Sequence, residues 1–97
     1  MKSEQELKEL REHREAVYGD AAGNHANTGM LWTAILQYHY RTTLPHPIPA
    51  HIVCLLLAAM KVERAAAPFQ AHPDNIDDGI NYLKMAFETD PRYKETP

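Results

Sequence analysis

The sequence predicts a single all-α domain, a compact bundle of about four helices, and three observations lead to this. Apolar residues recur at helical spacing in four segments, three alternate prolines separate the second segment from the third, and no stretch has the alternation of a half-buried strand. Ninety-seven residues allow one domain, 1–97, with residues 1–2 and 90–97 expected as loosely held ends. A lone core of this size is marginal, so we expect a homodimer or higher oligomer.

The first helix is predicted over about residues 3–18. Ser3 and Glu6 have the spacing of a capping box, in which each side chain satisfies a backbone N–H of the other. Leu7 and Leu10 then fall on one face, while the opposite face carries paired acids and bases. The sequence therefore predicts an amphipathic first helix with a charged outer face.

The sequence predicts where the second helix ends, but it leaves the first residue of that helix undecided. Residues 30–40 carry an apolar stripe of Leu31, Ile35 and Tyr38. The glycines before them weaken the start. The possible N-caps are Asp20, Asn24 and Asn27. Residues 44–49 contain the alternate prolines, so we expect an extended connector there.

The third and fourth helices are predicted on either side of a short loop. The third opens at Pro49 or Ala50, ends before Pro68, and is apolar on every side over residues 52–60. We therefore expect it to be central and surrounded by the other elements. The fourth runs from near Asp74 to the Asp90-Pro91 step. Its apolar stripe consists of Ile76, Ile80, Leu83 and Phe87.

Charge and composition bound the classes of partner. The formal net charge is −3, so no broad positive field would attract duplex nucleic acid. The N-terminal residues are highly charged and lack a signal-peptide segment, and residues 52–60 are too short to span a bilayer. We expect a cytoplasmic protein without a membrane partner, in the host cytoplasm if the gene is viral. The single cysteine, Cys54, is predicted as a small core residue.

Three groups of polar residues could carry chemistry, and the first lies between the first two helices. Asp20, Asn24 and His25 follow the sequence Tyr18-Gly19 there. A helix–turn–helix corner whose side chains satisfy backbone groups explains each residue taken alone. The functional alternative is that these three residues form the polar rim of a pocket.

The second group is a pair of cations at the end of the third helix. Lys61 and Arg64 are three residues apart and share one helix face. They could complement the helix dipole at a solvated end, or hold a phosphate with a point charge and a planar fork. Their position directly after a buried run favours the second possibility.

The third group opens the fourth helix. Asp74 and Asp78 can face the same way, with Tyr82 one turn further. They could cap the helix, hold Mg²⁺ through hard oxygen ligands, or form salt bridges with Lys61 and Arg64 across a groove. The sequence contains no zinc motif, no nucleophile motif and no glycine-rich phosphate loop, so catalytic residues stay unknown and no metal-binding residue is predicted.

Together these groups resemble a family of small, mostly phage-encoded domains of unknown function. In that family a helix ends in HGD or YGD, a long apolar helix ends in KxxR, and the last helix opens with a DN or DHW segment followed by D and GY. The matching residues here are Tyr18-Gly19-Asp20, Asn24, Trp32, Lys61-x-x-Arg64, His72-x-Asp74-Asn75, Asp78 and Tyr82. The family's GY is replaced by Asn81-Tyr82. The resemblance implies a viral origin and a helical fold, and no established activity.

The chain is also distantly similar to the MazG-like all-α nucleoside triphosphate pyrophosphohydrolases. Those enzymes oligomerise and hold Mg²⁺ with an ExxE pair on one helix and an ExxD pair on the next. Here the ExxE spacings lie only on the charged first helix, and the nearest substitute for ExxD is Asp74-x-x-Asp77. The metal site is therefore not carried over to particular residues.

From these observations we predict binding of a small phosphorylated ligand, a nucleotide or nucleotide signal, which a phage protein could sequester from host defence. The predicted ligand-binding residues are Asp20, Asn24, His25, Lys61, Arg64, His72, Asp74, Asn75, Asp78 and Tyr82. Two alternatives stay open. One is a Mg²⁺-dependent pyrophosphohydrolase of the MazG-like type, and the other is a structural or protein-interaction module without a ligand.

Overall fold

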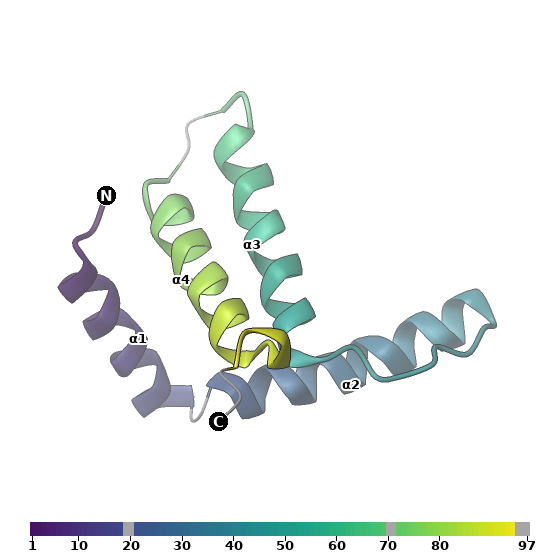
Figure 1. Cartoon of the computed structure of the whole chain (residues 1–97). Coiled ribbons are helices and arrows are strands. Elements are labelled where there is room, and N and C mark those ends of the chain that lie inside the picture. Colours follow the sequence, from purple (N-terminus) through teal and green to yellow (C-terminus); the bar gives the residue numbers. More distant parts are fainter. Residues whose placement is uncertain (19–20, 70–71, 95–97) are drawn as a thin grey trace.

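The computed structural model describes residues 1–18, 21–69 and 72–94, without the side chains of residues 15, 17, 18, 21 and 22. The helices are α1 (Glu4–Tyr18), α2 (Ala21–Tyr40), α3 (Ala50–Ala66) and α4 (Asp74–Thr89), followed by a short 3₁₀ helix (Pro91–Tyr93) (Figure 1). Within these ranges there is no strand, so the predicted all-α bundle of four helices is confirmed. No helix in the described part is long and apolar enough to cross a bilayer.

The first helix begins as predicted. The backbone N–H of Glu6 donates to Ser3 Oγ at 3.1 Å, and the backbone N–H of Ser3 donates to Glu6 Oε1 at 3.3 Å. These two bonds satisfy groups that a helix start otherwise leaves without a partner. The capping box therefore sets the start of α1.

The second helix begins at Ala21, well before the apolar stripe of residues 30–40. It continues through Gly23 and Gly29 without a break. Figure 1 shows the connector after α2 running back along that helix. Thr33 Oγ1 accepts the backbone N–H of Ile48 at 2.7 Å, and Gln37 Oε1 accepts that of Leu44 at 2.8 Å. The second half of α2 and the connector thus form one arm.

The third helix is central, since it packs against both α2 and α4. Val53 and Cys54 are fully buried, and Cys54 clusters with Met85 and Ala86 of α4. The core position predicted for Cys54 is confirmed. The expectation that α3 is surrounded is wrong for the single chain: Leu55 and Leu56 are 41% and 48% exposed, because only two neighbouring helices cover this one.

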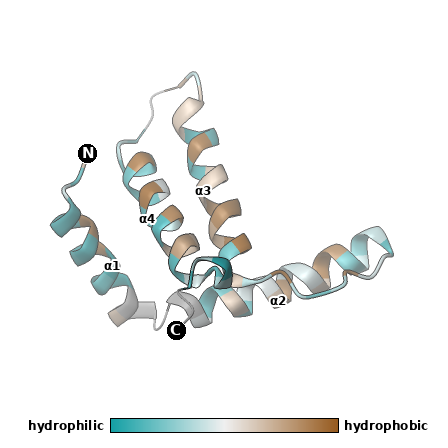
Figure 2. Cartoon of the chain, in the orientation of Figure 1, coloured by the Kyte–Doolittle hydropathy of each residue, from teal (hydrophilic) through white to brown (hydrophobic). Residues whose placement is uncertain are grey.

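The fourth helix buries polar residues and exposes apolar ones. Asp77, Asp78 and Asn81 are at most 6% exposed. Its apolar stripe lies on another face, where Ile76, Leu83 and Phe87 are at least half exposed. Figure 2 shows hydrophobic positions recurring along both α3 and α4. The single chain therefore uses the polar side of α4 for its own packing.

Charged groups dominate the contact between α1 and α4. Leu7 of α1 is buried, at 4% exposed. The backbone N–H of Lys2 donates to Asp77 Oδ1 at 2.8 Å, and Lys2 Nζ lies 3.0 Å from Asp74 Oδ1. Charged contacts across this interface also include Arg11–Glu88 and Lys84–Glu4, and the one at Asp78 is described below. We therefore expect α1 to be held largely by electrostatic contacts.

This predicts that acid and salt loosen α1 before they loosen α3. Hydrogen bonds from Lys2 and Arg11 hold the pKa of Asp74 and the pKa of Glu88 below their ordinary 3.8 and 4.5. A carboxyl whose pKa is lowered by the packing of α1 on α4 stabilises that packing at pH values above its ordinary pKa. This stabilisation is lost as the pH falls through the lowered pKa. Hydrogen exchange should show the protection of α1 amides falling several-fold at about pH 3, and also in about 1 M NaCl.

The matched control is the set of α3 amides at residues 53–58, measured in the same samples. They should keep their protection where α1 loses it, because apolar packing holds them. Loss of protection in both helices at the same pH and salt would contradict a separately held α1.

Candidate functional site

The carboxylate of Asp78 joins three helices. Its Oδ2 lies 3.1 Å from Lys61 Nζ on α3, and its Oδ1 accepts Arg14 Nη2 of α1 at 3.1 Å. The side chains of Asp78, Lys61 and Arg14 are 8%, 14% and 43% exposed. The salt bridge expected between Lys61 and the acidic start of α4 is therefore present, and a second cation comes from α1 rather than from Arg64.

A row of less polar contacts continues along α3 and α4 from this ion pair. His25 Nδ1 lies 3.2 Å from Cys54 Sγ, and the ring of His25 meets that of Tyr82 edge-on at 6.2 Å. Burial raises the pKa of the Cys54 thiol to about 11, so the thiol keeps its proton near neutral pH. Tyr82 also packs on the core cluster, so the structure brings His25 and Tyr82 together as packing partners.

Two predicted residues lie away from this row, and a third cannot be placed. Arg64 is exposed one turn beyond Lys61 and forms no ion pair with any residue in the described ranges. Asn24 is exposed near the start of α2, and Asp20 lies outside the described residues. The salt bridge expected from Arg64 to the start of α4 therefore does not form among the described residues, and the phosphate clamp of Lys61 and Arg64 stays a prediction.

The remaining three residues surround the start of α4. His72 Nδ1 accepts the backbone N–H of Asp74 at 3.2 Å, which is a capping contact. Asp74 is 53% exposed and pairs with Lys2. Asn75 lines an apolar groove between α3 and α4, away from α1. These residues lie near one another in sequence, but they face different surroundings.

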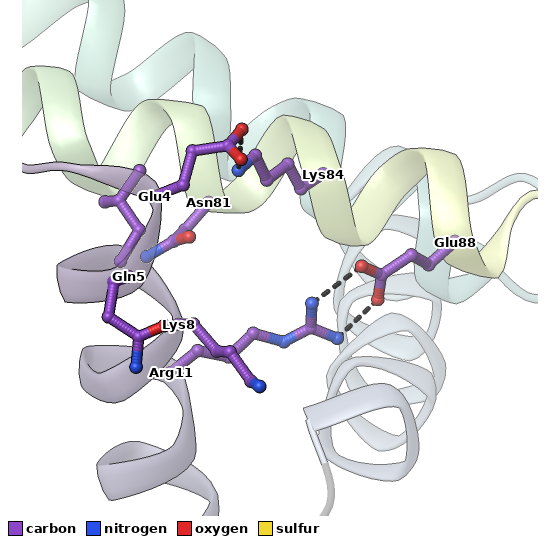
Figure 3. Close-up of a pocket in the computed structure, with 8 residues that line it drawn as sticks. Glu4, Gln5, Lys8, Arg11, Asn81, Lys84 and Glu88 are labelled. Carbon is purple, nitrogen blue, oxygen red and sulfur yellow. Dashed lines mark hydrogen bonds and ion pairs between the residues drawn. The ribbon is translucent and has the colours of Figure 1, made fainter.

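A polar groove of about 330 Å³ lies between α1 and α4 (Figure 3). Its walls carry three cations and two carboxylates, which leaves one positive charge. Arg11 spans it with a two-pronged contact to Glu88, and Lys84 Nζ reaches Glu4 Oε1 at 3.5 Å. The lining residues are Glu4, Gln5, Leu7, Lys8, Arg11, Asn81, Lys84 and Glu88.

The amide of Asn81 is the unexplained group of this groove. The residue is 5% exposed, and Figure 3 shows its amide pointing from α4 into the gap toward α1. It has no hydrogen-bond partner among the residues that the structure describes. The amide borders the groove, so it is a candidate for a hydrogen bond to a ligand there.

Metal-ligating side chains do not gather in the described ranges: no three His, Cys, Asp or Glu residues there are placed to share an ion. The acidic residues of α4 contact cations instead. Asp74 and Asp77 lie on Lys2, and Asp78 lies on Lys61 and Arg14. The acidic side chains at the start of α4 are thus paired with cations from α3, from α1 and from the residues before α1.

A family model described as "Domain of unknown function (DUF6378)" matches residues 5–90. This chain is a DUF6378 domain. The match contains all ten predicted site residues, the groove residue Asn81 and nearly all of the four helices. No similar protein was found among curated proteins or among solved structures.

Sequence reasoning missed two functional candidates of this DUF6378 domain, Arg14 and Asn81. Arg14 lies seven residues after Leu7, so the helical period places both on one face, and a cation on a buried stripe is a usable signal. Asn81 was visible only as a departure from the GY of the family that the sequence resembles. Its burial depends on the position of α1, which no local pattern indicates.

Proposed function

We propose that this domain binds a small phosphorylated ligand, a nucleotide or nucleotide signal, in the groove between α1 and α4. The observation that carries the proposal is the position of the Asn81 amide, which faces a groove bordered by cations and forms no hydrogen bond with another described residue. A volume of about 330 Å³ lies within the 300–1,000 Å³ common for small-molecule sites.

The cations on both sides of Asn81 favour phosphate as the charged part of the ligand. Asn81 follows Asp78 by three residues and precedes Lys84 by three, so the three side chains are neighbours on α4. Arg14 and Lys61 converge on Asp78, and Arg11 and Lys84 border the groove. Guanidinium forks and ammonium groups are the usual protein donors to phosphate oxygens.

Ligand entry requires exchange of existing contacts rather than loss of the core. Glu4 is 93% exposed in its pair with Lys84, and Glu88 is 45% exposed in its pair with Arg11. Exposed pairs of this kind contribute about 0–1 kcal/mol each. A phosphate can therefore replace these carboxylates at low cost, and the Asn81 amide can donate a hydrogen bond to it.

The test is a thermal-shift panel followed by calorimetry. The probes are ATP, GTP, CTP, UTP and inorganic pyrophosphate, each with and without MgCl₂, with pyrophosphate or phosphate release measured in parallel. At least one probe should raise the melting temperature without being consumed. Turnover with MgCl₂ would instead favour the pyrophosphohydrolase alternative, and no stabilisation by any probe would contradict the proposal.

Asn81→Leu locates the site. This change removes the amide at nearly constant volume, so the free energy of unfolding should stay equal or rise by about 1 kcal/mol while affinity falls at least about tenfold. Asn27→Leu is the matched control, because it makes the same change at an exposed residue of α2 that does not line the groove. A probe that binds Asn81→Leu as tightly as the unchanged protein does not occupy this groove.

The proposal extends to the biological role of the site. In a phage-encoded protein, such a site would sequester a host nucleotide signal in the cytoplasm without chemistry. We also infer that the working unit is a homo-oligomer, because the single chain exposes 7242 Å² whereas a compact 11.0 kDa protein exposes about 5600 Å².

A further inference from the structure

An apolar surface runs along the sides of α3 and α4 that face away from α1, and we call it the outer face. On α3, Leu55 and Val62 are 41% and 65% exposed, and on α4, Leu83 and Phe87 are 53% and 61% exposed. A groove of about 410 Å³ lies between the two helices on this face, with Lys61 and Asn75 as its polar lining. The outer face comprises Leu55, Ala59, Val62, Ile76, Ile80, Leu83 and Phe87.

The spacing of these residues is that of a helix-packing seam. Ile76, Ile80, Leu83 and Phe87 follow steps of four, three and four residues, which keep one stripe facing a partner helix. The polar residues that would normally face solvent on such a helix are instead buried within the chain: Asp77, Asp78 and Asn81. The outward stripe of α4 is therefore left open at Ile76 and Leu83, while Phe87 stacks on Tyr93 of the short 3₁₀ helix with ring centroids 5.0 Å apart.

We propose that a second copy of this chain covers the outer face, in a two-fold symmetric dimer that joins α3 and α4 of both copies into one bundle. The area supports this occupant. The whole chain, including the arm of α2 and the connector, exposes about 1600 Å² more than a compact monomer of its mass, and obligate dimers commonly bury 1,000–2,500 Å² per chain. A stripe that packs on its own copy needs no complementary partner surface elsewhere. This inference is independent of the ligand proposal.

The test is sedimentation velocity at micromolar concentration, with Leu83→Glu as the disrupting variant. The unchanged protein should sediment at twice the chain mass of 11.0 kDa. Leu83→Glu should weaken association at least about 30-fold, because it buries an unpaired charge in the seam. Helix content by circular dichroism should be unchanged, since Leu83 is half exposed in the folded chain. Ile76→Glu, also half exposed, serves as the second disrupting variant.

Leu31→Glu is the matched control, because Leu31 is 62% exposed on α2 and lies outside the outer face. It should leave the dimer intact. A monomeric unchanged protein would overturn the proposal. Dissociation by Leu31→Glu, with Leu83→Glu and Ile76→Glu both still dimeric, would assign the interface to α2 and overturn it equally.

Discussion

Replacing Asp78 with alanine is expected to lower the free energy of unfolding by about 3 kcal/mol, because the change leaves a largely buried ammonium group without its partner. Lys61 is 14% exposed and lies 3.1 Å from Asp78. The same change releases Arg14 and so loosens α1. For a domain of this size the melting temperature should fall by roughly 15 °C in a thermal melt followed by circular dichroism.

Two companion variants separate this effect from a general cost of removing acids. Asp74→Ala removes a half-exposed carboxylate from the same helix and should lower the melting temperature far less than Asp78→Ala does. Combining Asp78→Leu with Lys61→Met should recover most of the loss, because both charges leave together. Equal losses for Asp74→Ala and Asp78→Ala would contradict the central position given to Asp78.

Gly29→Ala is expected to destabilise the arm and its junction with α3 by about 2–3 kcal/mol. A Cβ at residue 29 would lie 1.9 Å from the carbonyl oxygen of Ile48 and 3.2 Å from Val53 Cγ2. The obstacle is backbone, which cannot move aside as a flexible side chain can. The connector would have to move away from α2, and a denaturant melt should show the loss.

Gly79→Ala is the control for this change. A Cβ there would meet Lys61 Cβ at 3.6 Å, an ordinary contact, and residue 79 lies inside α4. Alanine is favoured over glycine in a helix by about 1 kcal/mol, so Gly79→Ala should be neutral or stabilising. Similar destabilisation at both glycines would show that the close approach of Ile48 is not the cause.

The sequence predicted most of the fold because its strongest signals are local. The Ser3–Glu6 capping box, the proline at 49 and the Asp90-Pro91 step lie within one or two residues of the observed helix ends. The start of α2 was left open because Gly29 resembles a helix-weakening residue. The reason for glycine there is contact with Ile48, nineteen residues later in the chain, which no local pattern contains.

The candidate site was predicted only in part for the same reason. Lys61 and Asp78 were identified because each lies beside an apolar run on its own helix. Arg14 and Asn81 acquire their surroundings from the packing of α1 on α4, and that contact depends on charges far apart in sequence. The orientation of α4, with its polar side inward, could not be read from amphipathicity, because cations on α1 and α3 pair with its buried acids.

The most direct measurement of the central claim is a nitrogen–proton NMR titration that follows the side-chain amide of Asn81. ATP, or whichever probe stabilises the protein, is added to the full chain. The two amide proton signals of Asn81 should move and saturate together with the backbone signals of Arg14 and Lys84, while those of Arg41 stay in place. If the probe binds and the Asn81 amide signals do not move, the groove between α1 and α4 is not where this protein holds its ligand.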